Sequence, residues 1–364
     1  MHLLTNKNPI PMGAGVALQP GTWLMEDLDA ARMMTTAGGG ECQLTLFNPH
    51  PGMAQAFHDF GGTVTVVRPG RYGDLILLTP TLREIKRRWP TCTLQVSCLP
   101  HYRDALIGLP YIDNFLPYPL PMNLGDGLNY GALTSLEVLT ALFEREPELH
   151  MADLFAERLG LDSLATKKPD FILSPDELAW AHDAYPRTKH NRVAIQIKSS
   201  TPSRDYPMLQ MGDVIRRLHG RGWDVVLLGL PHEIVGKNED RITNCAKDQL
   251  TFRQSAAVLA TADVFLGPDS SLIHVAGAIG TPAVGLFSVV PWQLRTKYCP
   301  TTFVIQAKQG CDLAPCFHAP RGAMGFPAAG PCQKERKCCA LDTILPMEVV
   351  SKVEQMLTTA RVSG

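Results

Sequence analysis

The sequence has almost no charge imbalance: 34 Lys and Arg residues face 35 Asp and Glu residues, for a formal net charge of -1. No run of like charges occurs, so the electrostatic signature of a nucleic-acid-binding protein is absent. No apolar stretch approaches the roughly 20 residues that span a bilayer, and the N-terminus lacks the pattern of a signal peptide. We therefore expect a cytoplasmic protein without a transmembrane segment and without a nucleic-acid partner, and peripheral membrane contact stays open.

Two series of strand and helix patterns follow one another along the 364 residues. Residues 63–109 alternate short β-branched runs with helix-period segments, and residues 192–287 repeat this rhythm. The alternation is typical of parallel sheets covered by helices, so we predict an α/β protein with two Rossmann-like domains. Ligands of such sheets bind at the carboxyl ends of the strands, which places the expected site in a cleft between the domains.

The predicted boundaries divide the chain into four parts. Residues 1–61 form an N-terminal extension with no assigned role, and one segment of it, WLMEDLDAARMM, has a helix-like pattern. Residues 62–185 and 186–345 form the two Rossmann-like domains. Residues 346–364 are expected to form a closing amphipathic helix.

The segment RPGRYGDLILLTPTL, residues 68–82, is expected to contain the end of a strand and the start of a helix, with Asp74 in the first helical turn. Two roles fit Asp74. A carboxylate at this place stabilises the free N–H groups of the helix start. It is also placed to act as a general base toward a hydroxyl group in the site. The glycines do not follow the dinucleotide pattern GxGxxG, which disfavours a nicotinamide site.

A second strand-to-helix junction lies in GPDSSLIHVAGAIGTPAVGLF, residues 267–287. Asp269 follows the expected strand, Ser270 and Ser271 lie in the first helical turn, and His274 lies one turn further on. The N–H groups of such a helix start bind phosphate oxygens. The alternative is that Asp269 or Ser270 only caps the helix and that His274 is a hydrogen-bonded core residue.

Taken together, GDLILLTPTLREIKRRWP and GPDSSLIHVAGAIGTPAVGLF resemble the first and last signature segments of glycosyltransferase family 9, the heptosyltransferases of lipopolysaccharide assembly. The resemblance extends over about residues 63–355. It implies the GT-B fold, with the acceptor bound by the N-terminal domain and the nucleotide sugar by the C-terminal domain.

The resemblance also implies roles for single residues. Asp74 corresponds to the general base, and in SSTPSRDYP an Arg, Arg204, stands where the family has a phosphate-binding Lys. Leu77 stands where one heptosyltransferase subgroup has a His, which leaves the identity of donor and acceptor open. The residues expected to bind the donor are Ser199, Ser200, Thr201, Arg204, Glu233 (on the ribose), Leu250 and Thr251 (at the base), Asp269, Ser270, Ser271 and His274.

The implied reaction is an inverting transfer of a sugar, with heptose expected, from a nucleotide-diphosphate donor such as ADP-heptose to a hydroxyl of a glycan, lipid-linked or protein acceptor. No metal or other cofactor is required, because fixed donors neutralise the leaving diphosphate. Two alternatives share the fold: a sugar-nucleotide epimerase, which needs a second acid/base carboxylate near Asp74, and a carbohydrate-binding protein without turnover.

Five of the ten cysteines gather shortly before the expected closing helix. Four thiolates are enough for a tetrahedral metal site, and the intervening segment is poor in apolar residues. Some relatives that modify proteins carry an iron site with four cysteines there. The cluster therefore predicts structural Zn or Fe, with reduced thiols or a disulfide as the alternative; its members are Cys311, Cys316, Cys332, Cys338 and Cys339.

Overall fold

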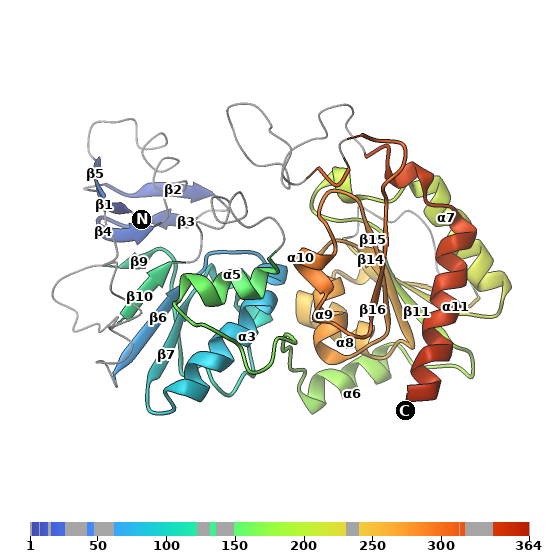
Figure 1. The fold of residues 1–364 in the computed structure, drawn as a ribbon, viewed down its shortest axis with the longest axis horizontal. Coiled ribbons are helices and arrows are strands. Elements are labelled where there is room, and N and C mark those ends of the chain that lie inside the picture. Colours follow the sequence, from blue (N-terminus) through green and yellow to red (C-terminus); the bar gives the residue numbers. More distant parts are fainter. Residues whose placement is uncertain are drawn as a thin grey trace.

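The computed structural model describes residues 2–6, 8–13, 16–25, 42–46, 62–121, 132–135, 149–230, 240–312, 314–316 and 338–363. Within these ranges the chain forms two α/β bodies that lie side by side, with a small antiparallel sheet next to the N-terminal body (Figure 1). The prediction of two parallel-sheet units in tandem therefore agrees with the strand order described next.

The N-terminal body contains a four-stranded parallel sheet in the order β10-β6-β7-β8. Its central strand β6 is buried at every position and consists of β-branched residues, as expected for a parallel strand covered on both faces. Its elements are β6 (Thr63–Val67), α3 (Tyr72–Arg88), β7 (Thr93–Ser97), the 3-10 helix η1 (Pro100–Ala105), β8 (Asn114–Leu116), β10 (Ala132–Ser135) and α5 (Met151–Arg158).

The N-terminal extension supplies β5, β1 and β4 of an antiparallel sheet in the order β5-β1-β4-β9, and it also forms a separate hairpin of β2 and β3. The strand β9 comes from the N-terminal domain and pairs with β4. The helix-like pattern that starts at Trp23 is wrong for its first three residues, because they belong to β4, where pairing with β1 overrides the local periodicity. The strands are β1 (His2–Asn6), β2 (Ile10–Gly13), β3 (Val16–Leu18), β4 (Gly21–Met25), β5 (Cys42–Leu46) and β9 (Leu120–Pro121).

The C-terminal body contains a six-stranded parallel sheet in the order β13-β12-β11-β14-β15-β16. β12, β14 and β15 are buried at every position, so the middle of this sheet is covered on both faces. The strands are β11 (Arg192–Gln196), β12 (Asp224–Leu228), β13 (Ile242–Asn244), β14 (Val264–Pro268), β15 (Ala283–Phe287) and β16 (Thr302–Gln306).

Helices cover the two faces of the C-terminal sheet differently. On the outer face, α7 and α11 close one apolar cluster with the sheet (Figure 1). On the inner face, α8 and α9 share a continuous apolar cluster with α3 and α5 of the N-terminal body. The helical elements are α6 (Pro175–Ala184), η2 (Pro202–Arg204), α7 (Met208–Gly220), η3 (Cys245–Asp248), α8 (Phe252–Ala260), α9 (Ser271–Ile279), α10 (Gln293–Thr296), η4 (Leu341–Thr343) and α11 (Pro346–Ser363).

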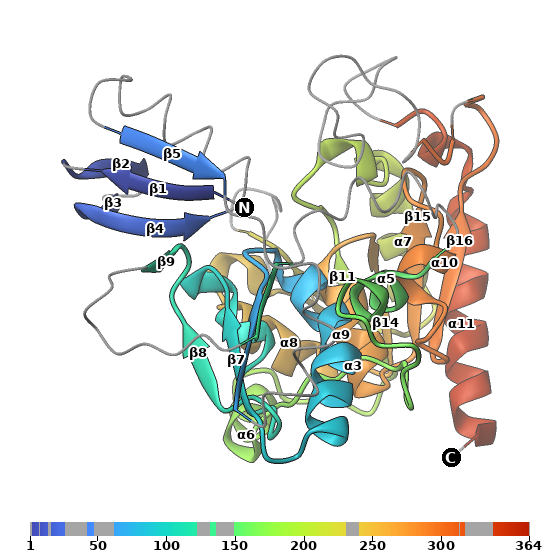
Figure 2. The same ribbon diagram turned by 60° about the vertical axis from the view of Figure 1, so that its left-hand side comes forward.

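This shared cluster determines where a site between the two bodies lies. Both views show α3 beside α8 and α9 (Figure 1, Figure 2). The starts of α3 and α9 follow the carboxyl ends of β6 and β14, and these two starts are the elements that the sequence singled out. Among the helices that the structure describes, none combines the length and apolar character needed to cross a membrane.

Candidate active site

The starts of α3 and α9 are in direct contact at the domain interface. Gly73 packs against His274: a Cβ atom added at Gly73 would lie 2.8 Å from Cδ2 of His274 and 3.7 Å from Cα of Ser271. A distance under 3 Å forces one of the two groups to move, so the approach depends on the missing side chain. The two junctions predicted from sequence therefore face one another.

Asp74 forms an ion pair with Arg68, with 2.7 Å between Oδ2 and Nη2. The Arg68 side chain is only 6% exposed, whereas that of Asp74 keeps 27% of its surface accessible. Burial raises the pKa of Asp74, but the Arg68 and Arg295 guanidiniums and the Arg71 backbone N–H outweigh it, and the pKa lies below the ordinary value. Asp74 is thus an ionised, partly accessible carboxylate.

Both roles considered for Asp74 have a counterpart in this geometry. Its bond from the N–H of Arg71, the N-cap residue of α3, stabilises the helix start, as the capping interpretation expects. Its side chain also keeps accessible surface at the interface, which a general base needs. The two roles are compatible because a carboxylate accepts several hydrogen bonds.

Ser270 occupies the N-cap position of α9, but its side chain makes no capping bond. Its hydroxyl oxygen instead accepts a hydrogen bond of 3.1 Å from Nε2 of Gln196. The first N–H groups of a helix have no partner inside the helix, and the helix dipole makes this end positive. The start of α9 can therefore bind an anion, and Ser271 provides one of these N–H groups.

Arg204 joins the loop after β11 to the start of α9. Its Nη1 donates to the backbone oxygen of Asp269 at 3.1 Å and lies 3.6 Å from Oδ2 of the same residue. Asp269 is buried, so its carboxylate is held next to a cation. The pair brings two predicted donor-binding residues together.

The hydroxyl groups of the loop after β11, residues 199–201, form hydrogen bonds both within the loop and to the N-terminal body. Oγ of Ser199 donates to the backbone oxygen of Thr201 and accepts from its N–H, as an ordinary polar loop would. Ser200 is exposed, and its hydroxyl accepts a bond of 3.1 Å from Nη1 of Arg71 in the N-terminal body. Ser200 thus connects the loop to the residue that precedes α3.

His274 is buried in the first turns of α9. Burial lowers its pKa to about 4, against the opposing effect of Asp269, so the imidazole is neutral at neutral pH. Its Nδ1 has no hydrogen-bond partner within the described part of the chain. The interpretation of His274 as a fully hydrogen-bonded core residue is therefore wrong for this nitrogen.

Sequence reasoning missed Arg68 and Arg295. Arg295 lies on α10 and is buried, which lowers the pKa of its guanidinium. The negative charges of Asp269 and Asp74 raise this pKa and oppose the effect of burial. With His274 neutral, three arginines and two aspartates leave one excess positive charge in this group. An excess buried cation favours an anionic ligand. Arg68 lies only six residues before Asp74, whereas no local pattern marks Arg295.

The residues predicted at the nucleotide base lie beside the same interface. Thr251 caps α8, with its hydroxyl oxygen accepting from the Gln254 N–H, and Leu250 packs against the core. The next residue, Phe252, stacks on Tyr72 of α3 with 3.8 Å between ring centroids. Glu233 lies outside the described residues.

The cysteine cluster is described in part. Cys311, Cys316, Cys338 and Cys339 are placed, and Cys332 lies outside the described residues. Within the described ranges no group of three or more His, Cys, Asp or Glu side chains is arranged to hold a metal ion. The four placed thiols therefore do not fit a tetrahedral site by themselves.

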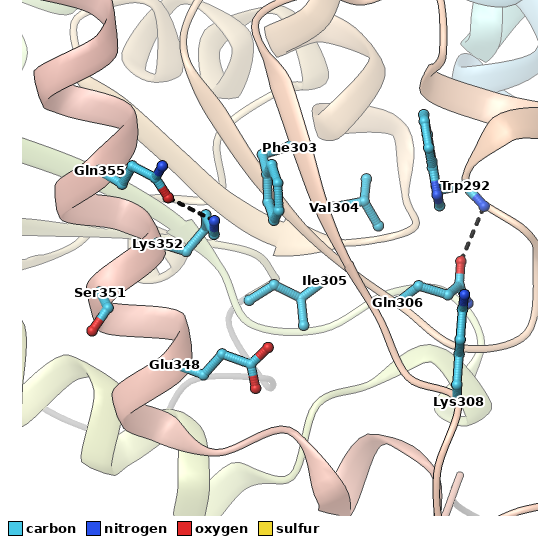
Figure 3. Close-up of a pocket in the computed structure, with 10 residues that line it drawn as sticks. All are labelled: Trp292, Phe303, Val304, Ile305, Gln306, Lys308, Glu348, Ser351, Lys352 and Gln355. Atoms are coloured by element: carbon cyan, nitrogen blue, oxygen red, sulfur yellow. Dashed lines mark hydrogen bonds between the residues drawn. The ribbon is translucent and has the colours of Figure 1, made fainter.

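A groove of about 640 Å³ lies away from this interface, between the edge strand β16 and α11 (Figure 3). None of the predicted site residues lines it, and its charged groups are one carboxylate and two lysines. We assign it no part in the chemistry. Its lining residues are Trp292, Phe303, Val304, Ile305, Gln306, Lys308, Glu348, Ser351, Lys352 and Gln355.

Comparisons with known proteins agree with this arrangement. The model of the family described as glycosyltransferase family 9 (heptosyltransferase) matches residues 148–320. The chain is 22% identical to lipopolysaccharide heptosyltransferase 3 of Escherichia coli, over 61% of this chain and 84% of that protein.

Solved structures extend the comparison to the fold. The ADP-heptose lipopolysaccharide heptosyltransferase II of E. coli has a TM-score of 0.56 and 15% identity, covering 82% of this chain and 99% of that one. The dodecameric iron-containing heptosyltransferase TibC of E. coli, in complex with ADP-D-beta-D-heptose, has a TM-score of 0.57 and 14% identity, covering 98% and 91%. The predicted GT-B fold with two Rossmann-like domains is confirmed.

Proposed function

This chain belongs to glycosyltransferase family 9 and is a glycosyltransferase, and we propose that it transfers heptose from ADP-heptose to an acceptor hydroxyl with inversion at the anomeric carbon. The observation that carries the proposal is the direct contact between the Asp74 junction and the Ser270–Ser271 junction. A nucleophile activator and an anion-binding helix start are the two groups that such a transfer needs, and here they lie at the same interface.

In the proposed reaction, Asp74 accepts the proton of the acceptor hydroxyl as its oxygen attacks the anomeric carbon. The bond from this carbon to the diphosphate oxygen breaks, and the electron pair leaves with the diphosphate. Arg204 and the N–H groups at the start of α9 bind the charge that develops there. The excess positive charge around Arg295 supports the departure of an anionic leaving group.

The choice of ADP-heptose as donor is supported by the relatives. Heptosyltransferase II is described as an ADP-heptose enzyme, and TibC was solved with ADP-D-beta-D-heptose. We assign the ribose to Glu233, the base to the backbone around Leu250 and Thr251, and the diphosphate surroundings to Ser199, Ser200, Thr201, Asp269 and His274. The acceptor is a glycan, a lipid-linked glycan or a protein.

The alternatives are less well supported. An epimerase needs a second accessible carboxylate near Asp74, and Asp269, which is in the same charged group, is buried and held by Arg204. A binding protein without turnover does not need an ionised carboxylate at the interface. The named relatives above are transferases.

The test is an assay of nucleotide release with ADP-heptose and a panel of other nucleotide sugars, each with and without lipopolysaccharide core or candidate protein acceptors. Sustained ADP release that requires both ADP-heptose and an acceptor supports the proposal. Conversion of the sugar nucleotide without an acceptor would instead identify an epimerase. Binding of sugar without any release would identify a carbohydrate-binding protein.

Two further predictions belong to the proposal. Catalysis needs no metal, and a structural Zn or Fe at the cysteine cluster depends on Cys332. Metal analysis of the purified protein, with Cys332→Ser as comparison, tests this. A cytoplasmic location, with peripheral membrane contact where the acceptor is lipid-linked, is tested by cell fractionation.

A further inference from the structure

We propose that Arg68 is a positioning residue of the transfer reaction: it holds the Asp74 carboxylate at the domain interface through one oxygen, so that the other oxygen takes the acceptor proton. The inference rests on the proposed function, in which Asp74 is the general base. Arg68 itself touches Asp74 and acts through it.

The position of Arg68 is built by three neighbouring elements. Its backbone N–H donates to the oxygen of Ser97 at 2.9 Å, which continues the pairing of β6 with β7 by one residue. Its side chain passes Gly70, where an added Cβ would lie 3.1 Å from both Cγ and Nε. Its guanidinium lies 5.8 Å from the centre of the Phe155 ring on α5. The guanidinium therefore has little freedom to leave Asp74.

The buried Arg68 side chain fixes the orientation of the more exposed Asp74 side chain. Arg68 is 6% exposed, so a rotation of Asp74 away from it would leave a buried cation without its carboxylate. The charge-assisted bond from Nη2 to Oδ2 ties one oxygen of the carboxylate to this buried group. Arg68 thus keeps the carboxylate of Asp74 in one place, which is what a general base needs toward a bound hydroxyl.

The same contact controls the protonation of Asp74. The groups that face this carboxylate are the Arg68 and Arg295 guanidiniums, the Arg71 N–H and the neutral His274 ring. Burial raises the pKa of Asp74, and Arg68 opposes it both by its charge and by its hydrogen bond. Removing Arg68 therefore raises this pKa, and Asp74 becomes protonated at a pH where the wild type is ionised.

The experiment compares Arg68→Met, Arg68→Lys and the control Arg83→Met by the pH profile of kcat. Arg83 lies on α3, nine residues after Asp74, and pairs with Asp170. This pair is more exposed than that of Arg68, and its loss removes an Arg–Asp ion pair without touching the base. We expect kcat of Arg68→Met to fall by roughly 100-fold and its acidic limb to move to higher pH. Arg68→Lys keeps the positive charge, so we expect the acidic limb of its pH profile to stay near that of the wild type. Arg83→Met should leave the acidic limb unmoved.

Thermal unfolding verifies that each variant is folded. If Arg68→Met does not fold, Arg68→Lys carries the test. Its ammonium keeps the positive charge but does not reproduce the Nη2 bond in its present geometry, so kcat falls while the acidic limb stays. A wild-type kcat in Arg68→Lys, or an unmoved limb in a folded Arg68→Met, would overturn the inference. Wild-type transfer by Asp74→Asn would instead overturn the proposed function, and the two failures are therefore distinct.

Discussion

The starts of α3 and α9 occupy equivalent places in the two domains but carry opposite chemistry. Each follows the carboxyl end of a parallel strand, and the N-cap side chain of neither makes a capping bond. α3 supplies its own anion, Asp74, in the first turn. α9 has no acidic residue in its first turn and presents hydroxyl and N–H groups.

The difference follows from the helix dipole. A carboxylate inside the first turn neutralises the positive end of α3, so this end has little attraction left for a second anion. The positive end of α9 keeps its attraction for an anion from outside. One fold position thus carries the proposed base in the N-terminal domain and the proposed anion site in the C-terminal domain.

The largest expected effect comes from removing the charge of the α3 start. Asp74→Asn keeps the shape but accepts a proton poorly, so we expect turnover to fall by roughly 100- to 10,000-fold, with donor affinity nearly intact. Single-turnover assays and donor titrations measure the two quantities. Asp176→Asn, an exposed residue in the first turn of α6, is the matched control and keeps full turnover. Full activity of Asp74→Asn would place the base elsewhere.

The second-largest effect is expected on donor affinity, when the proposed anion site at the start of α9 is weakened. Arg204→Ala removes the cation next to Asp269, and we expect donor binding to lose about 1.5–3 kcal/mol, measured by calorimetric titration. Arg217→Ala breaks a more exposed ion pair with Asp213 and serves as the control with unchanged donor affinity. An unchanged affinity in Arg204→Ala would argue against a diphosphate contact.

A third variant pushes the starts of α3 and α9 apart. Gly73→Ala places a methyl group 2.8 Å from the buried His274 ring, which must move. We expect kcat to fall by roughly 10- to 100-fold and the free energy of unfolding to fall by about 1–3 kcal/mol. Gly212→Ala in α7, where an added Cβ meets nothing within 4 Å, is expected to stabilise the fold slightly. Wild-type kcat in Gly73→Ala would show that the close contact is dispensable.

The smallest effect on turnover is expected at the other end of α3, where Glu84 is buried. The pKa of Glu84 is lowered to about 2, chiefly by hydrogen bonds from Arg87 and also by those from Arg88 and the Ala165 N–H. Burial acts in the opposite direction and raises this pKa. Its stabilisation is complete above the ordinary pKa of 4.5 and is lost as the pH falls toward about 2. Glu84→Gln should therefore cost on the order of 3 kcal/mol at neutral pH, with turnover unchanged under folding conditions.

Denaturant unfolding at several pH values measures this stability. The difference between wild type and Glu84→Gln should shrink as the pH falls below 4.5. A difference that stays constant over this range would show that Glu84 stabilises the fold by packing and not by its charge. The comparison then distinguishes a structural carboxylate from the reactive one on the same helix.

Local periodicity predicted elements of both domains. The pattern TVTVV matches β6, and MLQMGDVIRRLHG matches α7 residue for residue. These segments could be predicted because the strand and helix periods are written in consecutive residues. The pattern at Trp23 failed because strand pairing with a distant segment overrode it.

The site was predictable as two separate junctions, because Asp74 and Ser270 each stand at a strand-to-helix transition that the local pattern marks. Their contact through Gly73 and His274 was not, since two domains must first dock on a shared apolar cluster. Arg295 acts on Asp74 only through this docking, because the two residues belong to different domains. Short-range order therefore specifies which chemical groups exist at each helix start, and long-range packing alone decides which of them share one buried, low-dielectric space.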